Sequence, residues 1–168
     1  SKVIKEENRK VTAYHEGGHA LVARFLPETD PVNKITIVPR GRAAGVTWFL
    51  PEERDFKYKD QLENELAVAF GGRVAEELIF NRISTGAAGD IKMATDLASR
   101  MVRSWGMSDL GPLSYAKDEE HIFIGREIAQ HRDFSEETAR RIDEEITKFI
   151  DNAYDKAQSV LKEKIDIL

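Results

Sequence analysis

Residues 15–19 read His15-Glu16-Gly17-Gly18-His19, and they lie inside a run of apolar residues at helical spacing. Because Pro27 follows this run, we expect a first helix of about twenty residues at most. Four residues advance a helix by about 400°, which returns the second histidine to within about 40° of the first. Two imidazoles on one helix face can bind one metal ion. The apolar positions of the predicted helix are Val11, Tyr14, Gly18, Leu21, Val22 and Phe25.

The residue between the histidines adds a second chemical role. Glu16 lies about 100° round the helix from His15, close enough to accept a proton from water at such an ion without binding the ion itself. The alternative is a pair of surface histidines that meet nothing. Gly17 and Gly18 argue against that alternative, because each glycine weakens a helix interior by about 1 kcal/mol relative to Ala. They indicate that another backbone approaches the helix there.

A catalytic zinc usually takes three protein ligands and one water, so the chain must supply another His, Asp or Glu. The extended motif with a third histidine ten residues after the first is excluded, because that residue is Phe25. His121 and His131 are the other histidines. Both lie in polar surroundings, and we expect them at the surface.

Two carboxylates remain as candidates for the third ligand. Glu76 lies on the apolar face of the second predicted helix, and a carboxylate on an apolar face needs a partner. That partner is either a metal ion or Arg73, one turn earlier. Asp90 follows a loop of small residues and begins a helix, where the helix dipole keeps a carboxylate ionised. Its alternative role is a plain helix-start aspartate. Spacing alone does not decide between Glu76 and Asp90.

Outside the first helix, the pattern predicts one small sheet and three more helices. Residues 35–38 and 45–50 are β-branched and aromatic and suggest a hairpin. A second helix carries Leu62 to Phe80, and a third begins at Asp90 with Thr95 and Trp105 facing inward. Residues 113–127 show neither helical nor strand periodicity, which predicts a loop or a short irregular section. Ser135 is a good N-cap for a long last helix. The predicted fold class is α+β, predominantly helical, with one small sheet or hairpin after the first helix.

Composition limits the possible function classes. The 168 residues are 41% hydrophobic and 33% charged, which is ordinary for one soluble globular domain. A formal net charge of −5 disfavours a nucleic-acid partner. The absence of cysteine excludes any metal site built on sulfur. No apolar run approaches the ~20 residues of a membrane helix. The chain begins Ser-Lys and its helical period continues to Leu168, so we expect a fragment of a longer protein.

The motifs of this sequence are residues 15–19, 71–77 (GGRVAEE), 84–90 (STGAAGD), 94–95, 35–40, 45–47, 106–108 and 111–113. Taken together, they resemble the peptidase domain of the FtsH family of ATP-dependent, membrane-anchored zinc metalloproteases. The resemblance covers nearly the whole chain, with its motifs in the family's order and spacing. One departure is Gly17, where the family commonly has alanine.

The resemblance implies a zincin-like HExxH helix and a role for each candidate residue. Zn²⁺ would be held by His15, His19 and Asp90, with Glu16 as general base. Glu76 would not bind the metal itself but would orient one of the histidines that do. The resemblance thus favours Asp90 over Glu76 as third ligand.

The resemblance also implies that residues 1–168 form a zinc metallopeptidase domain whose AAA ATPase and transmembrane parts lie upstream. No Walker-type phosphate loop occurs in this sequence, so ATP would be used only by that absent module. The full-length protein would be a membrane-anchored homo-hexamer that degrades unfolded polypeptides. This domain would lie on the cytoplasmic side in bacteria or in an organelle compartment, and would meet the membrane only through the absent N-terminal part.

We expect the substrate to lie as an extended strand against the segment that starts with Gly45, Val46 and Thr47, because pairing with a sheet edge accepts many sequences. An ordinary half-buried strand is the alternative for this segment. Two other functions fit the whole chain less well. A non-catalytic helical interaction module would not need Glu16, and a cytidine-deaminase-like hydrolase would want cysteine ligands.

Overall fold

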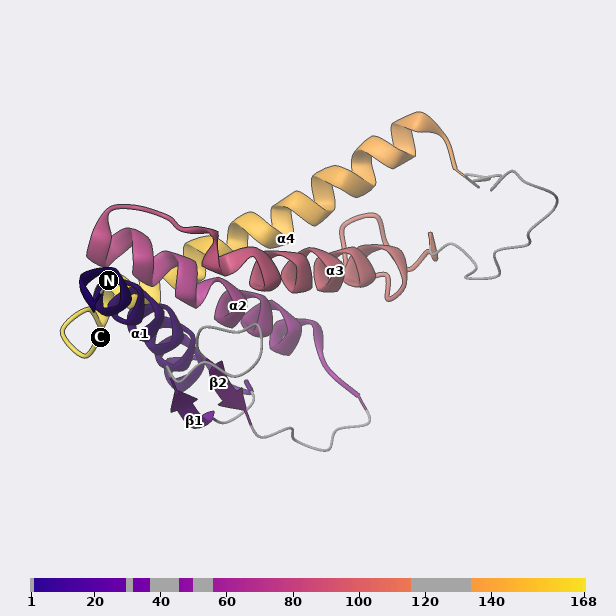
Figure 1. Ribbon diagram of the computed structural model, residues 1–168. Helices are drawn as coiled ribbons and strands as arrows, with labels where there is room; N and C mark the ends of the chain where they lie inside the picture. The colour runs from indigo at the N-terminus through magenta and orange to yellow at the C-terminus, as the bar shows by residue number, and fades with distance from the viewer. Residues whose placement is uncertain (1, 30–31, 37–45, 50–55, 116–133) are drawn as a thin grey trace, which may run out of the picture.

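Four helices make up most of the described part of the chain, which in this computed structural model comprises residues 2–29, 32–36, 46–49, 56–115 and 134–168 (Figure 1). This part is predominantly helical, as predicted. The elements in chain order are α1 (Lys2–Phe25), β1 (Val32–Thr36), β2 (Val46–Phe49), α2 (Lys59–Phe80), the 3-10 turn η1 (Thr85–Ala87), α3 (Ala88–Arg103) and α4 (Glu136–Glu163).

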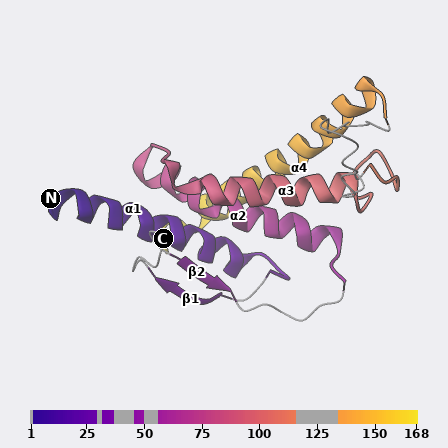
Figure 2. The same cartoon turned by 45° about the vertical axis from the view of Figure 1, so that its right-hand side comes forward.

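Helix α2 lies at the centre and contacts α1, α3 and α4 (Figure 2). A helix that packs on several sides must be apolar on several sides, and α2 buries side chains along most of its length. Helices α3 and α4 each present one apolar stripe to it. The buried core comprises Leu21, Val22, Leu62, Leu66, Ala67, Ala69, Phe70, Val74, Ala75, Ala94, Ala98, Met101, Val102, Ile142, Phe149, Ala153, Ala157 and Leu161.

The packing of α1 against α2 depends on two glycines that face each other. A Cβ added to Gly18 would lie 2.2 Å from the carbonyl oxygen of Gly71, and one added to Gly71 would lie 2.6 Å from that of Gly18. Both distances are far inside van der Waals contact, so neither position accepts a side chain without moving a helix. Gly17 differs, because among the described residues its added Cβ would meet only Leu168, at an ordinary 3.4 Å. The approach of a second backbone therefore takes place at Gly18 and not at Gly17.

Local signals in the sequence begin and end the helices. The Ser135 hydroxyl accepts a hydrogen bond from the backbone N–H of Thr138 at 3.2 Å, which confirms the predicted N-cap of the last helix. At the end of α2, Asn81 adopts a left-handed conformation (φ 52°), and its N–H bonds the carbonyl of Glu77. Helix α1 is 24 residues long, longer than predicted, because it extends further towards the N-terminus.

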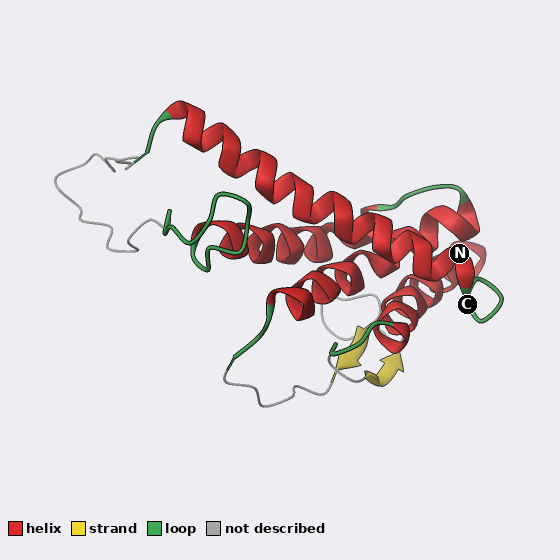
Figure 3. Ribbon diagram, turned by 180° about the vertical axis from the view of Figure 1, so that it is seen from behind, coloured by secondary structure: helices red, strands yellow, loops and turns green. Residues whose placement is uncertain are grey.

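The two short strands pair antiparallel and lie beside α1 (Figure 3). Thr36 is opposite Val46, and an irregularity interrupts the register between Val32 and Lys34. Of the two segments for which β structure was predicted, residues 37, 38, 45 and 50 lie outside the described residues. Residues 113–115 form a loop, and residues 116–133 also lie outside the described part.

Three side chains predicted to face the core do not. Phe25 and Trp105 are 39% and 41% exposed, and Thr95 is exposed as well. Phe25 is the last residue of α1, and Trp105 lies two residues beyond the end of α3. Each ring is instead approached by a cation, Lys164 in the case of Phe25. Helix α4 ends at Glu163, short of the predicted continuation to the last residue, and turns follow.

The glycine contact makes a prediction about stability. Replacing Gly18 with alanine should lower the free energy of unfolding by about 1–3 kcal/mol, because the new methyl group meets the α2 backbone. Gly17→Ala is the matched control. It should be neutral or stabilise by up to about 1 kcal/mol, since alanine is the better helix former and the space is open. Urea unfolding of both variants with chelator present measures this. Equal stabilities of the two variants would contradict the packing argument.

Candidate metal centre

Two helices bring three potential metal ligands together. His15 and His19 lie one turn apart on α1, and Asp90 lies in the first turn of α3. The His15 Nε2 and His19 Nε2 atoms are 3.1 Å apart, and Asp90 Oδ2 lies 2.9 Å from the first and 3.1 Å from the second. These residues form the one group of potential metal ligands found among the described residues. Both histidines are buried, whereas Asp90 is half-buried.

The other nitrogen of each ring is held by α2. His15 Nδ1 donates to Glu76 Oε2 at 2.8 Å, and His19 Nδ1 donates to the backbone carbonyl of Val68 at 2.7 Å. A carboxylate and a carbonyl both accept, so each Nδ1 carries the proton and each Nε2 is left with its lone pair. The two lone pairs and the Asp90 oxygen therefore converge on one point.

This convergence shows that the site suits a cation. Without one, a proton on His15 Nε2 takes its place and faces two acceptors, His19 Nε2 and Asp90 Oδ2. Burial lowers the pKa of His15, but the hydrogen bonds to Asp90 and Glu76 outweigh burial and raise this pKa to about 8. Burial likewise raises the pKa of Asp90, but the hydrogen bonds from both histidines bring it down to about 2. A metal ion that enters this cluster competes with the proton for the same nitrogen atom.

The spacing of the three atoms also matches zinc. A tetrahedral zinc with ligands at ~2.0–2.1 Å keeps those ligands roughly 3.3 Å apart. The observed separations of 2.9 to 3.1 Å are a few tenths of an ångström shorter, so a small outward movement accommodates the ion. Two imidazoles and one carboxylate leave a fourth position open, as in catalytic zinc sites. The residues present therefore fit zinc.

Small residues and one loop hold these groups in place. A Cβ added to Gly72 would lie 2.4 Å from His15 Nε2, so this glycine makes room for the imidazole against α2. Glu76 is 2% exposed, and its second oxygen accepts from the backbone N–H of Ser84 at 3.2 Å. Ser84 precedes η1, which leads directly into the helix start that carries Asp90. The loop of small residues thus couples Glu76 to Asp90.

The remaining candidate residues fall in different places. Glu16 is half-buried on α1, directly after His15. The suggested partnership of Arg73 with Glu76 is wrong, because both oxygens of Glu76 bond other groups; Arg73 instead lies near Tyr154. Outside the described residues are His121, His131 and Gly45, while Val46 and Thr47 lie in β2.

Sequence reasoning missed two parts of this site. The Val68 carbonyl gave no signal, because every residue carries a carbonyl and only the fold selects this one. Gly72 did leave a signal: two adjacent glycines inside a helix cost about 1 kcal/mol each relative to Ala, which indicates a packing reason. The reason is the bulk of the His15 ring.

The chain matches characterised proteins over its whole length. Peptidase family M41 matches residues 2–168. Three similar proteins are named as FtsH ATP-dependent zinc metalloproteases: those of Magnetococcus marinus (55% identical over 170 residues), Acidobacterium capsulatum (52% over 169) and Sphaerobacter thermophilus (FtsH 1, 54% over 170). Each match covers 100% of this chain.

The same matches cover only 25 to 26% of the relatives, so this chain spans about a quarter of their length. Among the described residues, no helix is both long enough and apolar enough to cross a membrane. The family match and the identities near 50% over the full chain agree with the site geometry. The chain belongs to peptidase family M41 and corresponds to the peptidase domain of the FtsH proteins.

Proposed function

We propose that this chain is a zinc-dependent endopeptidase domain that hydrolyses peptide bonds in unfolded polypeptides. One observation carries the proposal: His15 and His19 direct their Nε2 lone pairs at the same point as Asp90, beside a glutamate on the same helix. Three ligands with one open position are typical of zinc hydrolases, whereas structural zinc sites take four protein ligands. A site with an adjacent Glu16 is suited to hydrolysis.

His15, His19 and Asp90 are the proposed ligands. A zinc ion held by them supplies a Lewis acid that polarises the scissile carbonyl and makes a water molecule acidic. Glu76 and the Val68 carbonyl keep the two imidazoles turned towards the ion, each through one Nδ1–H hydrogen bond. The loop N–H of Ser84 holds Glu76 in turn.

Glu16 is the proposed general base. Its carboxylate accepts a proton from the attacking water while the water oxygen bonds the carbonyl carbon. Glu16 then gives that proton to the amide nitrogen as the carbon–nitrogen bond breaks, which releases an amine and a carboxylic acid. The carboxylate is thereby regenerated, so one residue serves as base and then as acid.

We further propose that substrate binds as an extended strand beside β2, where Val46 and Thr47 lie, with Gly45 just before them. Two features support this placement. Strand β2 lies beside α1, the helix that carries the histidines, and main-chain pairing favours no particular side chain. The β1–β2 pair is then the small sheet of an α+β peptidase fold with an HExxH helix.

The full-length protein, on this proposal, adds an AAA ATPase module and a membrane segment to the peptidase domain formed by residues 1–168. The relatives' name includes the words ATP-dependent, and they are about four times as long as this chain. The ATPase module would unfold substrates and deliver them here within a homo-hexameric ring anchored to a membrane. The domain itself would then lie on the cytoplasmic side or in an organelle compartment.

Substituting the proposed base should separate metal binding from catalysis. Glu16→Gln should keep zinc and lose more than nine tenths of the activity on an unfolded protein, because the amide cannot accept a proton but no ligand is removed. Glu7→Gln changes an exposed glutamate of the same helix and should keep full activity. Zinc content and casein cleavage are measured on both. A Glu16→Gln enzyme with more than a tenth of the parental rate would rule out this role.

The two carboxylates near the histidines should differ in zinc retention. Asp90→Asn should weaken zinc binding far more than Glu76→Gln, because an amide is a poor zinc ligand. Losing the group that orients His15 typically lowers metal affinity by only about 10–100-fold. Asp151→Asn, an exposed aspartate on α4, is the control. Chelator competition measures the affinities. Parental affinity in the Asp90 variant would return the third-ligand role to Glu76 or His121.

Without its motor, the domain should distinguish unfolded from folded substrates. The 168-residue chain should cut casein slowly, leave a stable folded domain intact, and respond to ATP in neither case, because it has no phosphate-binding loop. Cleavage of both substrates is followed with and without ATP, and sedimentation tests self-association. Loss of the folded substrate that depends on ATP would contradict a peptidase lacking its motor.

A further inference from the structure

The chain leaves α1 through a tight turn that leads to the small sheet. In a continued helix the carbonyl of Ala23 would accept from the N–H of residue 27, but Pro27 has no N–H. The Thr29 hydroxyl donates to this carbonyl instead, at 2.9 Å, and also to that of Leu26, at 3.3 Å. Strand β1 begins at Val32, three residues after Thr29, and three residues span about 11 Å at most. The turn therefore decides where the small sheet starts.

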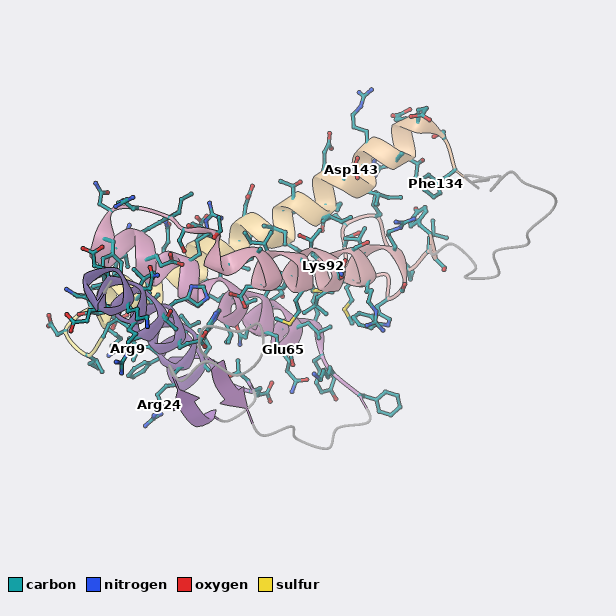
Figure 4. The ribbon with its side chains drawn as sticks, viewed as in Figure 1. Arg9, Arg24, Glu65, Lys92, Phe134 and Asp143 are labelled. Carbon is teal, nitrogen blue, oxygen red and sulfur yellow. The ribbon has the colours of Figure 1, made fainter. Side chains whose placement is uncertain are left out.

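A buried amide on α2 holds this turn. Asn64 is 8% exposed, and its Nδ2 donates to the Pro27 carbonyl at 3.0 Å. Its Oδ1 accepts from Lys156 Nζ of α4 at 2.9 Å. A lysine can only donate and a carbonyl can only accept, so these two partners fix which way the amide points. In Figure 4, the labelled Glu65 marks this part of α2 and the labelled Arg24 marks the end of α1. Three segments far apart in the sequence thus meet at one side chain.

Packing alone would not favour an amide at this place. A leucine would fill a similar volume and would bury apolar surface without removing a polar group from water. A buried hydrogen bond adds little net stability, because the same groups bond water in the unfolded chain. It does supply direction, since it forms only within a narrow range of distances and angles. Asn64 therefore fixes the position of the turn more than it adds stability.

The same part of α2 also holds a metal ligand. Val68, whose carbonyl accepts from His19 Nδ1 at 2.7 Å, follows Asn64 by four residues, about one helical turn. Pro27 follows His19 by eight residues. Helix α2 therefore bonds α1 at the imidazole and bonds the chain again just past the end of α1. Because one rigid turn of α2 makes both bonds, Asn64 relates the start of the small sheet to the position of the metal site.

We propose that Asn64, held in turn by Lys156, is a positioning residue that sets the β1–β2 sheet at the correct distance from the metal ligands. The inference rests on the proposed peptidase function, in which an extended substrate strand lies beside β2. A strand paired there brings its scissile bond to the metal only if the sheet is correctly placed, and a displacement of about 1 Å is enough to slow cleavage strongly. Asn64 acts through the turn, and Lys156 acts through Asn64.

The test is the dependence of cleavage on substrate length. A series of blocked peptides extends from one cleavable bond, from about four residues to about ten, which is long enough to pair along β2. For the parental chain, kcat/KM should rise with length as pairing is added. Asn64→Leu keeps the side-chain volume but removes both hydrogen bonds. It should lower kcat/KM for the longest peptide roughly tenfold, and leave the shortest peptide that the parental chain cleaves within about twofold. Zinc affinity should stay parental.

Variants of Lys156 test the second half of the proposal. Lys156→Met should show the same loss in weaker form, whereas Lys156→Arg still donates and should keep the parental length dependence. Asn64→Leu combined with Lys156→Met should be no worse than Asn64→Leu alone, because the two side chains act as a unit. Lys156 is half-buried, so Lys156→Met tests the role even if Asn64→Leu does not fold. The matched controls Asn152→Leu and Lys162→Met change exposed residues of α4 and should keep parental rates.

The outcomes separate this role from the peptidase function. If the parental chain cleaves neither casein nor any peptide, the peptidase function fails and the positioning role fails with it. If the parental chain cleaves but Asn64→Leu and Lys156→Met show the parental dependence on length, the positioning role alone is overturned. Equal losses at every length together with weaker zinc binding would also overturn it, because they indicate a general loss of folded structure.

Discussion

The contact of α1 with α2 at Gly18 and Gly71 is the constraint on which the rest of the site depends. With hydrogen in place of a side chain at both positions, the two backbones approach closely enough for the rings on α1 to reach acceptors on α2. Any larger residue at this crossing would push the helices apart by an ångström or more. Hydrogen bonds of 2.7 and 2.8 Å from the two imidazoles would not survive such a movement.

The histidine cluster shares one proton when no cation is bound. Three acceptor atoms within 3.1 Å of one another leave one proton among them, in a place that water reaches poorly. The surrounding fold has to hold this arrangement through hydrophobic packing and through the hydrogen bonds of Glu76. A preformed site of this kind needs little rearrangement when a metal ion enters.

Helix α3 carries the carboxylate of the candidate site and part of the core within a few residues. Its first turn carries Asp90, the next turn carries the exposed Met93, and its inner face packs Ala98 and Met101 into the core. Because a helix is rigid over this distance, the packing of Ala98 and Met101 in the core fixes the position of Asp90. The placement of Asp90 beside the two histidines thus depends on how this helix packs.

The sequence alone was enough for features that depend on local geometry. Helical periodicity puts His15 and His19 on one face whatever the rest of the chain does, and the Ser135 cap and the helical character of the fold follow from nearby residues in the same way. Tertiary structure decided the features that join distant segments. From spacing alone, Asp90 and Glu76 were equally good candidates for the carboxylate beside the two Nε2 atoms. Asp90 lies 71 residues after His19, so its distance from these atoms depends on how α3 packs. The sequence did not predict that Glu76 pairs with His15 instead of Arg73. It also did not predict the hydrogen bond of His19 to the Val68 carbonyl. A periodic pattern shows which face a residue occupies, but only the packed helices show what that face meets.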